Sequence, residues 1–274
     1  MTAADGRPPG PAGAVSFETL TWEVDGGIGV VTLNRPEVRN ALDRRMAGEL
    51  QQTLDEAADP EIRAVVVTGA GGSFCSGQDL QAIAGEGDSF SAGTIVRETW
   101  NPIVLRVRML EKPVVAAVGG PAVGAGLSLA LACDIRVASE EAVLSLGFTR
   151  IGLMPDAGAT WLLPRLVGLG RALELALSAR SVPADEALGL GLVERVVPGD
   201  RLMDEAREIA SRLAAGPTAA YAGTKQAINR SFELTLAEAL ELEADLQDRI
   251  ARTPDAAEGI RAFLEKRRPA FRGR

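Results

Sequence analysis

Residues 113–161, PVVAAVGGPAVGAGLSLALACDIRVASEEAVLSLGFTRIGLMPDAGATW, decide the fold of this chain. Val114 to Val118 is wholly apolar, which is typical of a buried parallel strand. A glycine-rich turn through Gly124-Ala125-Gly126 then opens a helix of small residues from Leu127 to Cys133. The first N–H groups of such a helix have no acceptor inside it, and glycines let another group approach closely. The stretch therefore predicts a main chain that can hold a negative oxygen, with Asp156 as the nearby carboxylate.

The amino-acid composition excludes several classes of catalytic site. The chain of 274 residues contains no histidine, which excludes Ser-His-Asp and Cys-His catalysis and every histidine metal site. The two cysteines, Cys75 and Cys133, cannot form a four-cysteine zinc site, and we expect them to be buried, unreactive thiols. We expect no metal, and proton transfer is left to Asp, Glu, Lys, Cys or the single tyrosine, Tyr221.

The charge balance bears on partners and location. A formal net charge of −8 gives no long-range attraction to nucleic acid or to an anionic membrane. No apolar run approaches the roughly 20 residues of a membrane span, and the first residues lack the charged-then-apolar pattern of a signal peptide. We therefore expect a cytoplasmic protein that binds neither nucleic acid nor membrane.

Strand and helix patterns alternate through the first part of the chain. The alternating segment from Phe17, with a glycine turn at Asp25 to Gly27, predicts a β-hairpin. The apolar runs 64–68 and 114–118, joined by a predicted helix over 94–110, predict parallel strands of an α/β fold.

Three segments follow from this pattern. The first is rich in Gly and Pro and is expected to be disordered, the second carries the strands, and the third is expected to be entirely helical. Their bounds are 1–14, 15–199 and 200–274.

Two glycine turns follow the two apolar strands, FCSGQDL at 74–80 and VGAG at 123–126. Neither carries the Lys-Ser/Thr of a P-loop or the third glycine of a dinucleotide-binding fingerprint. If the two strands are neighbours, main-chain N–H groups from both turns can converge on one oxygen. Such a pair fits a thioester carbonyl turning into an enolate, and each donor can lower the barrier by on the order of 3 kcal/mol.

Four stretches carry a resemblance to a known family: NRPEVRNAL (34–42), FCSGQDL, AAVGGPAVGAGLSLALACDIRVAS (116–139) and IGLMPDAGATWLLPRLVG (151–168). With them the sequence resembles the crotonase superfamily, also called the enoyl-CoA hydratase/isomerase family, over residues 15–274. The resemblance implies a spiral of ββα units and a C-terminal helical module that builds trimers, often paired into hexamers. It also implies that the N–H groups of Gln78 and Ala125 form the oxyanion hole.

The same resemblance bears on the reaction. The hydratases of the family place two glutamates across the substrate double bond, and the matching positions here hold Ser128 and Phe148. Asp156 lies where the isomerases carry their catalytic aspartate, and the surrounding run is most similar to the ring 1,2-epoxyphenylacetyl-CoA isomerase. An acyl-CoA isomerase using Asp156 as acid/base is therefore favoured. A hydratase with Asp156 alone directing water, and a non-catalytic acyl-CoA-binding scaffold, stay open as alternatives.

Coenzyme A carries phosphates and so calls for local positive charge. Arg35 and Arg39 flank the NRP turn and are the candidates on this side of the chain. By resemblance, Phe263 and Lys266 reach the coenzyme A of a neighbouring subunit, and main chain from Phe74 to Ser76 meets the adenine. No separate cofactor is expected, because coenzyme A is part of the thioester substrate.

Three acids also have plain structural interpretations. Asp156 precedes a predicted helix and could simply cap it. We expect Asp79 to cap the helix that follows it, and Asp134 to make a structural hydrogen bond or ion pair beside Arg136.

Overall fold

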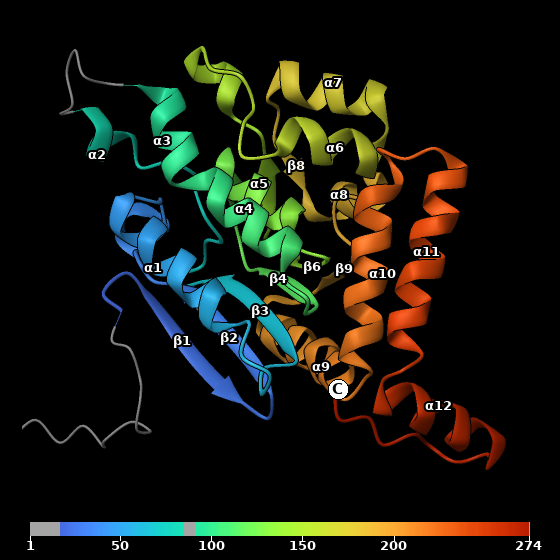
Figure 1. The fold of residues 1–274 in the computed structure, drawn as a ribbon. Coiled ribbons are helices and arrows are strands. Elements are labelled where there is room, and N and C mark those ends of the chain that lie inside the picture. Colours follow the sequence, from blue (N-terminus) through green and yellow to red (C-terminus); the bar gives the residue numbers. More distant parts are fainter. Residues whose placement is uncertain (1–16, 85–90, 274) are drawn as a thin grey trace, which may run out of the picture.

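The computed structural model describes residues 17–84 and 91–273 (Figure 1), so the predicted disorder of residues 1–14 lies outside the described residues. Nine strands form two sheets in this part of the chain. In spatial order the larger sheet contains β1 (Leu20–Asp25), β2 (Ile28–Leu33), β3 (Ala64–Gly69), β4 (Val114–Val118), β6 (Ile135–Ser139) and β9 (Arg195–Val197). The smaller sheet contains β5 (Ala122–Val123), β7 (Val143–Ser145) and β8 (Val182–Pro183).

The first two strands form the predicted hairpin. They pair antiparallel from Leu20 opposite Leu33 to Asp25 opposite Ile28. The two-residue turn places Gly26 at φ 56° and Gly27 at φ 78°, a left-handed backbone that glycine adopts without steric cost. The predicted hairpin is therefore confirmed at its predicted turn.

The remaining strands of the larger sheet run parallel, and the central β3 and β4 are buried on both faces. β3 pairs with β4 from Val65 opposite Val114 to Thr68 opposite Ala117, which confirms that the two apolar strands are neighbours. Alternate residues enter two separate apolar cores, Val65 and Val67 on one side and Ala64 and Val66 on the other. An uninterrupted run of apolar residues is what such a doubly covered strand requires.

Helices cover both faces of this sheet. On one side lie α1 (Arg44–Glu56), α4 (Trp100–Met109) and α5 (Ala125–Ala132); on the other lies α9 (Leu202–Ala214). Around the smaller sheet and its connections lie α2 (Leu80–Ala84), α3 (Ala92–Glu98), α6 (Ala159–Val167), α7 (Leu169–Ser178) and α8 (Ala184–Leu190). Short 3₁₀ turns are η1 (Pro36–Val38), η3 (Phe148–Ile151) and η4 (Gly199–Arg201).

The chain ends in three helices that project from the sheet core: α10 (Thr218–Ser231), α11 (Leu236–Ile250) and α12 (Pro254–Leu264) (Figure 1). The predicted helical region began at residue 200, but α9 buries Ala206, Ile209 and Ala210 against the sheet. The apolar face of α9 thus belongs to the second apolar core. Of the α-helices in the predicted helical region, only α10 to α12 contribute no residue to either core.

The predicted helix over 94–110 is two helices in the structure. α3 ends and α4 begins at Thr99, whose φ of −110° and ψ of −72° depart from helical geometry. The Thr99 N–H keeps its helical bond to the carbonyl of Ile95 at 2.9 Å, and the Thr99 hydroxyl donates to the same carbonyl at 2.7 Å. Pro102 has no N–H to donate to the carbonyl of Glu98, which accepts from the Gln51 side chain instead. The break turns α4 so that Trp100 at its start faces inward, 1 % exposed.

Two glycine substitutions test how closely the turns after β3 and β4 must pack. A Cβ on Gly126 would lie 2.2 Å from the carbonyl oxygen of Cys75, whereas a Cβ on Gly48, in α1, would meet nothing within 4 Å. We expect Gly126→Ala to lower the free energy of unfolding by about 1–3 kcal/mol. Gly48→Ala should raise it by about 0.5–1 kcal/mol.

Urea unfolding of the two variants beside the wild type measures both changes. A Gly126→Ala protein as stable as Gly48→Ala would contradict the close approach of the two turns.

Candidate active site

The first candidate oxyanion donor lies on the turn after β3. The carbonyl of Gly77 accepts from the N–H of Leu42 at 2.8 Å. Because the peptide unit is planar and trans, the N–H of Gln78 in the same unit points the opposite way, away from Leu42. Gly77 and Gln78 both line a mostly apolar cavity on that side, so this N–H faces the cavity.

The second candidate donor is the N–H of Ala125, the first residue of α5. Gly124, at φ 56°, turns the chain into the helix, and its carbonyl accepts from the N–H of Ser128 at 3.1 Å. The N–H of Ala125 therefore points out of the helix N-terminus, where the helix dipole also favours negative charge. In residues 17–84 and 91–273, neither this N–H nor that of Gln78 has an acceptor.

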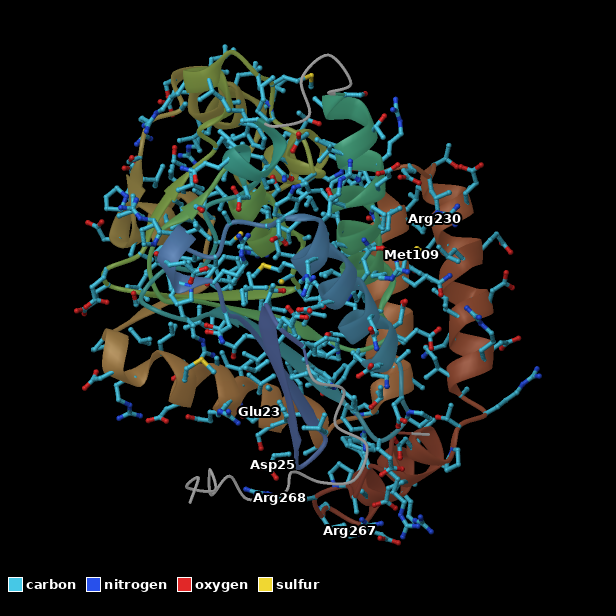
Figure 2. All side chains as sticks on the ribbon, turned by 90° about the vertical axis from the view of Figure 1, so that its left-hand side faces the viewer. Glu23, Asp25, Met109, Arg230, Arg267 and Arg268 are labelled. Atoms are coloured by element: carbon cyan, nitrogen blue, oxygen red, sulfur yellow. The ribbon has the colours of Figure 1, made fainter. Side chains whose placement is uncertain are left out.

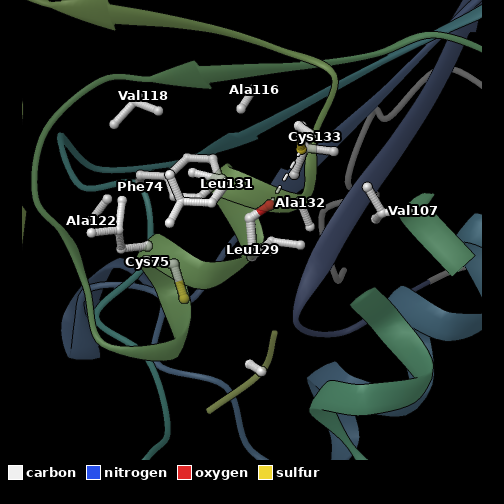
Figure 3. Packing of buried hydrophobic residues seen from close by; sticks show 14 of the residues in the cluster. Phe74, Cys75, Val107, Ala116, Val118, Ala122, Leu129, Leu131, Ala132 and Cys133 are labelled. Atoms are coloured by element: carbon white, nitrogen blue, oxygen red, sulfur yellow. Dashed lines mark hydrogen bonds between the residues drawn. The ribbon is translucent and has the colours of Figure 1, made fainter. Parts of the chain in front are cut away.

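The two turns are bonded to each other. The N–H of Phe74 donates to the carbonyl of Pro121 at 3.0 Å, and the N–H of Val123 donates to the carbonyl of Cys75 at 2.9 Å. Behind them, Phe74 and Ala122 pack into the apolar core beside Leu131 (Figure 3). The structure thus brings Gln78 and Ala125 together, as the sequence predicted, by a short parallel pairing of the two turns.

A cavity of about 210 Å³ opens in front of these donors. Most of its wall is apolar, and among its described lining residues Asp156 carries the only carboxyl group. The apolar lining side chains are Leu80, Ala92, Ile95, Val96, Trp100, Val123, Ala125, Phe148, Ile151 and Leu153. Such a wall suits an acyl group.

Asp156 lies between η3 and α6, and its side chain does not cap the helix. The N-cap of α6 is Gly158, with no side-chain hydrogen bond, and the main-chain carbonyl of Asp156 accepts from Ala159. The Oδ1 atom of Asp156 is buried without a hydrogen-bond partner in the described part of the chain. Burial in this apolar setting raises the pKa of the Asp156 carboxyl to about 6. An unpaired carboxyl with a raised pKa is suited to accept and return a proton.

Ser128 and Phe148 are the two residues that the resemblance aligns with the hydratase glutamates. Ser128 is fully buried, and its hydroxyl lies 3.1 Å from the carbonyl oxygen of Asp156 and 3.4 Å from that of Gly124. Phe148 is 8 % exposed and forms part of the cavity wall. Ser128 therefore holds the main chain of Asp156 against α5, and Phe148 adds apolar surface.

Arg35, a predicted coenzyme A contact, is engaged within the chain. Its guanidinium lies 3.2 Å from the Asp43 carboxylate and 3.0 Å from that of Asp79, and it donates to the carbonyl of Ala41 at 2.7 Å. Asp79 also accepts from the N–H groups at the start of α2, as expected for its cap. The arginine therefore fixes the 35–43 turn to the segment that follows Gln78.

The other residues predicted on this side differ in exposure. The Arg39 side chain is exposed, on a left-handed backbone at φ 54°, and its carbonyl accepts from the N–H of Ser76 at 3.0 Å. Ser76 lines the cavity, whereas the Phe74 side chain is fully buried in the core. Only the main chain of Phe74 to Ser76 is thus placed to meet a ligand, and that contact stays a prediction.

Phe263 and Lys266 lie far from the cavity of their own chain. Phe263 is 82 % exposed on α12, at the end of the molecule opposite to α2 and α3 (Figure 1). Figure 2 shows Arg267 and Arg268 at the same end. Any contact of Phe263 or Lys266 with coenzyme A would therefore have to be made in another subunit.

Asp134 makes the structural hydrogen bond and ion pair expected of it, and neither is made with its sequence neighbour Arg136. Its carboxylate pairs with Lys225 at 2.8 Å and accepts from the N–H of Val114, while Arg136 pairs with Glu194. The Arg136 guanidinium also donates to the carbonyls of Cys133 and Leu192, so it makes its own set of contacts and does not pair with the neighbouring Asp134. Asp134 therefore has the structural role expected of it, and its ion-pair partner Lys225 belongs to α10.

Both cysteines are free and buried. Burial raises the pKa of the Cys75 and Cys133 thiols to about 12, so neither is available as a nucleophile near neutral pH. In the described residues no cluster of three or more potential ligand residues could hold a metal ion. Nor does the described chain contain a helix that is both long and apolar enough to cross a membrane.

Sequence reasoning missed one polar contact at the base of the cavity. The indole N–H of Trp100 donates to the side-chain oxygen of Gln78 at 2.9 Å. A tryptophan at the start of an apolar helix is normally predicted to be a core residue. Only the break at Thr99 turns Trp100 toward the turn that contains Gln78.

With this geometry in place, comparison with known proteins identifies the family. Residues 23–274 match the family model for enoyl-CoA hydratase/isomerase. The chain belongs to this family and is an enzyme of it, which confirms the predicted membership of the crotonase superfamily.

Relatives match over nearly their whole length. A probable enoyl-CoA hydratase of Rhodobacter capsulatus is 45 % identical, over 95 % of this chain and 100 % of its own. The 1,2-epoxyphenylacetyl-CoA isomerase of Escherichia coli is 41 % identical, over 94 % and 100 %. The crystal structure of an enoyl-CoA hydratase/isomerase from Cupriavidus metallidurans superposes with a TM-score of 0.88 at 39 % identity, over 94 % of this chain and 98 % of that one. The predicted α/β crotonase fold is thereby confirmed.

Burial of Asp156 predicts a pH-dependent stability. Because its folded pKa is raised to about 6 from 3.8, the folded state favours the protonated form and is penalised as pH rises through 6. We expect Asp156→Asn to be more stable than the wild type by about 2 kcal/mol at pH 8, with the difference fading toward pH 4.

Thermal unfolding of both proteins from pH 4 to 8 measures the difference, with the exposed Asp185→Asn as the matched control. Equal stability of Asp156→Asn and wild type at pH 8 would contradict the buried, unpaired carboxylate.

Proposed function

We propose that this protein is an acyl-CoA isomerase that passes through a thioester enolate. The single observation that carries the proposal is the half-buried Asp156 carboxyl, whose Oδ1 has no hydrogen-bond partner among the described residues, in a cavity that also receives the N–H groups of Gln78 and Ala125. The positions at which hydratases of the family carry two glutamates hold Ser128 and Phe148. One acid/base group and one oxyanion site are sufficient for moving a proton between two carbons.

The proposed reaction uses these groups in sequence. The thioester oxygen accepts from the two N–H groups, which acidifies the C–H next to the carbonyl. The Asp156 carboxylate removes that proton, and the electron pair forms an enolate whose oxygen stays in the oxyanion site. The protonated Asp156 then returns the proton to a carbon farther along the acyl group, so the double bond moves and the overall composition is unchanged.

Two acyl classes suit the cavity. A 3-enoyl thioester would become the conjugated 2-enoyl thioester by the steps above. A phenylacetyl thioester with a ring epoxide would be isomerised with Asp156 assisting epoxide opening, and the 41 % identity to the Escherichia coli ring-epoxide isomerase supports this class. The aromatic side chains of Trp100 and Phe148 in the cavity wall also favour a flat acyl group.

A second candidate function is hydration of a 2-enoyl-CoA. The Rhodobacter capsulatus relative is named a probable hydratase, and a carboxyl with a pKa near 6 is largely ionised at neutral pH and could direct a water molecule. Against it, the Ser128 hydroxyl is directed to main-chain carbonyls and Phe148 is apolar, so a second positioned carboxylate is absent from the described cavity.

Coenzyme A and the oligomer belong to the same proposal. Large apolar side chains on the last two helices are exposed in the single chain: Leu236, Leu240, Ile260, Phe263 and Leu264. We propose that they pack in a trimer or a dimer of trimers, in which Phe263 and Lys266 meet the coenzyme A of a neighbour. Coenzyme A enters as part of the substrate, with no separate cofactor. The cytoplasmic location stays a prediction.

An assay with 3-hexenoyl-CoA tests the isomerase directly. We expect the absorbance of the conjugated 2-enoyl thioester to appear with the wild type. Asp156→Asn should slow the reaction by about 10²–10⁴-fold, because the acid/base group is removed while the shape is kept. Asp185→Asn on the exposed start of α8 should retain wild-type activity.

A ring-epoxide phenylacetyl-CoA and a 2-enoyl-CoA, run beside it, separate the candidate reactions. Full activity of Asp156→Asn on every substrate would overturn the mechanism, and 3-hydroxyacyl product as the fastest outcome would favour hydration.

The pH profile provides an independent check. A base must be ionised to accept the first proton, so kcat/KM should rise with pH and level off above about 6, where burial has placed the pKa of Asp156. A profile that is flat from pH 5 to 8 would argue against Asp156 as the base. Measuring the profile with Asp185→Asn as well excludes an effect of surface charge.

A further inference from the structure

The side-chain amide of Gln78 is held at both ends. Its Nε2 donates to the carbonyl of Leu42 at 2.9 Å, and its Oε1 accepts from the indole Nε1–H of Trp100 at 2.9 Å. The main chain of this turn is tied to Leu42 as well, since the Leu42 carbonyl accepts from the N–H of Asp79 and the Leu42 N–H donates to the carbonyl of Gly77. The main chain on either side of Gln78 is therefore bonded to Leu42, and the side chain of Gln78 bonds to Trp100 in α4.

These bonds restrict the rotation of the peptide unit that contains the Gln78 N–H. Turning that N–H away from the cavity requires the Gly77 carbonyl to leave Leu42. The side chain of Gln78, bonded at both ends, restrains the Cα atom about which that peptide unit would turn. Trp100 is 1 % exposed, so its indole N–H would find no water to replace the amide oxygen if this bond were lost. The buried indole thus opposes reorientation of the donor.

Trp100 also lines the same cavity as the two donor residues. Its ring is part of the cavity wall, and it starts α4, which packs against α5, the helix that begins with Ala125. One rigid side chain therefore contacts the space for the acyl group and bonds to the residue that supplies an oxyanion donor. Preorganised donors are effective because they need no reorganisation as charge develops on the oxygen.

We infer that Trp100 is a positioning residue, which acts through the side-chain amide of Gln78 to hold the Gln78 N–H in line with the thioester oxygen. The inference rests on the proposed function, because it assigns a task to that oxyanion site. It extends to the side chain of Gln78, whose main chain alone was expected to matter. Asp156 takes no part in it.

The test uses Trp100→Phe, which keeps an aromatic wall but removes the N–H, and Gln78→Met, which keeps length and the main-chain N–H but removes both side-chain bonds. Trp22→Phe in β1, outside the cavity, is the matched control. With 3-hexenoyl-CoA, or the ring-epoxide substrate if that proves faster, each site variant should lower kcat about tenfold with KM changed less than about threefold.

The double variant should be no slower than the slower single variant, because both changes remove the same hydrogen bond between Trp100 and Gln78. Additive losses, or kcat unchanged in both folded single variants, would overturn the inference. Thermal unfolding establishes which variants are folded, and Gln78→Met carries the test alone if Trp100→Phe is not.

A second readout separates this inference from the proposed function. A conjugated thioester such as 4-dimethylaminocinnamoyl-CoA absorbs farther to the red when its carbonyl accepts strong hydrogen bonds. We expect a red shift on binding to wild type and to Trp22→Phe, and a smaller shift with Trp100→Phe or Gln78→Met. A full shift in the site variants would overturn the positioning role of Trp100 but would leave the proposed oxyanion site standing. No shift with the wild type would overturn both the proposed oxyanion site and the positioning role of Trp100.

Discussion

The site depends on one short pairing between two turns that are far apart in the sequence. The hydrogen bond from the Val123 N–H to the Cys75 carbonyl joins the turn after β3 to the turn after β4. It forms only because the two parallel strands are neighbours and Gly126 has no side chain to keep Cys75 away. From it follow the common direction of the Gln78 and Ala125 N–H groups and the place of the cavity in front of them.

The same close packing explains the chemistry available to Asp156. Apolar walls that seat an acyl group also remove water from the carboxyl, and its pKa rises because the charged form loses solvation. Ser128 fixes the main chain at this point but donates nothing to the carboxyl oxygens. The backbone beyond it is held at a positive φ of 49° at Ala157, a conformation that costs about 1 kcal/mol or more for a residue with a side chain. The burial that raises the pKa of Asp156 and suits it to proton transfer thus also lowers the stability of the folded protein near neutral pH.

Local patterns in the sequence predicted what is decided locally. The paired glycines after Asp25 specify the hairpin turn, and the unbroken apolar runs at β3 and β4 specify strands covered on both faces. Gln78, Ala125 and Asp156 were found because turn chemistry and the family motifs mark them. The partner of Asp134, the place of α9 on the sheet and the Trp100–Gln78 bond were not, because each depends on which distant elements meet. The split at Thr99 could have been suspected, since a threonine that bonds back to the preceding turn disturbs a helix.

The arrangement of polar groups gives a physical reason to favour isomerisation. Moving a double bond returns the same proton to a different carbon, so one carboxyl that can both lose and gain a proton is enough. Adding water requires a water molecule to be held and activated beside the alkene while a proton is delivered to the next carbon. Of the two residues that the resemblance aligns with the hydratase glutamates, Ser128 is buried outside the cavity lining with its hydroxyl on main-chain carbonyls, and Phe148 is part of the cavity wall. Neither supplies a second carboxylate, so the polar groups of the described cavity match the reaction that needs one acid/base group.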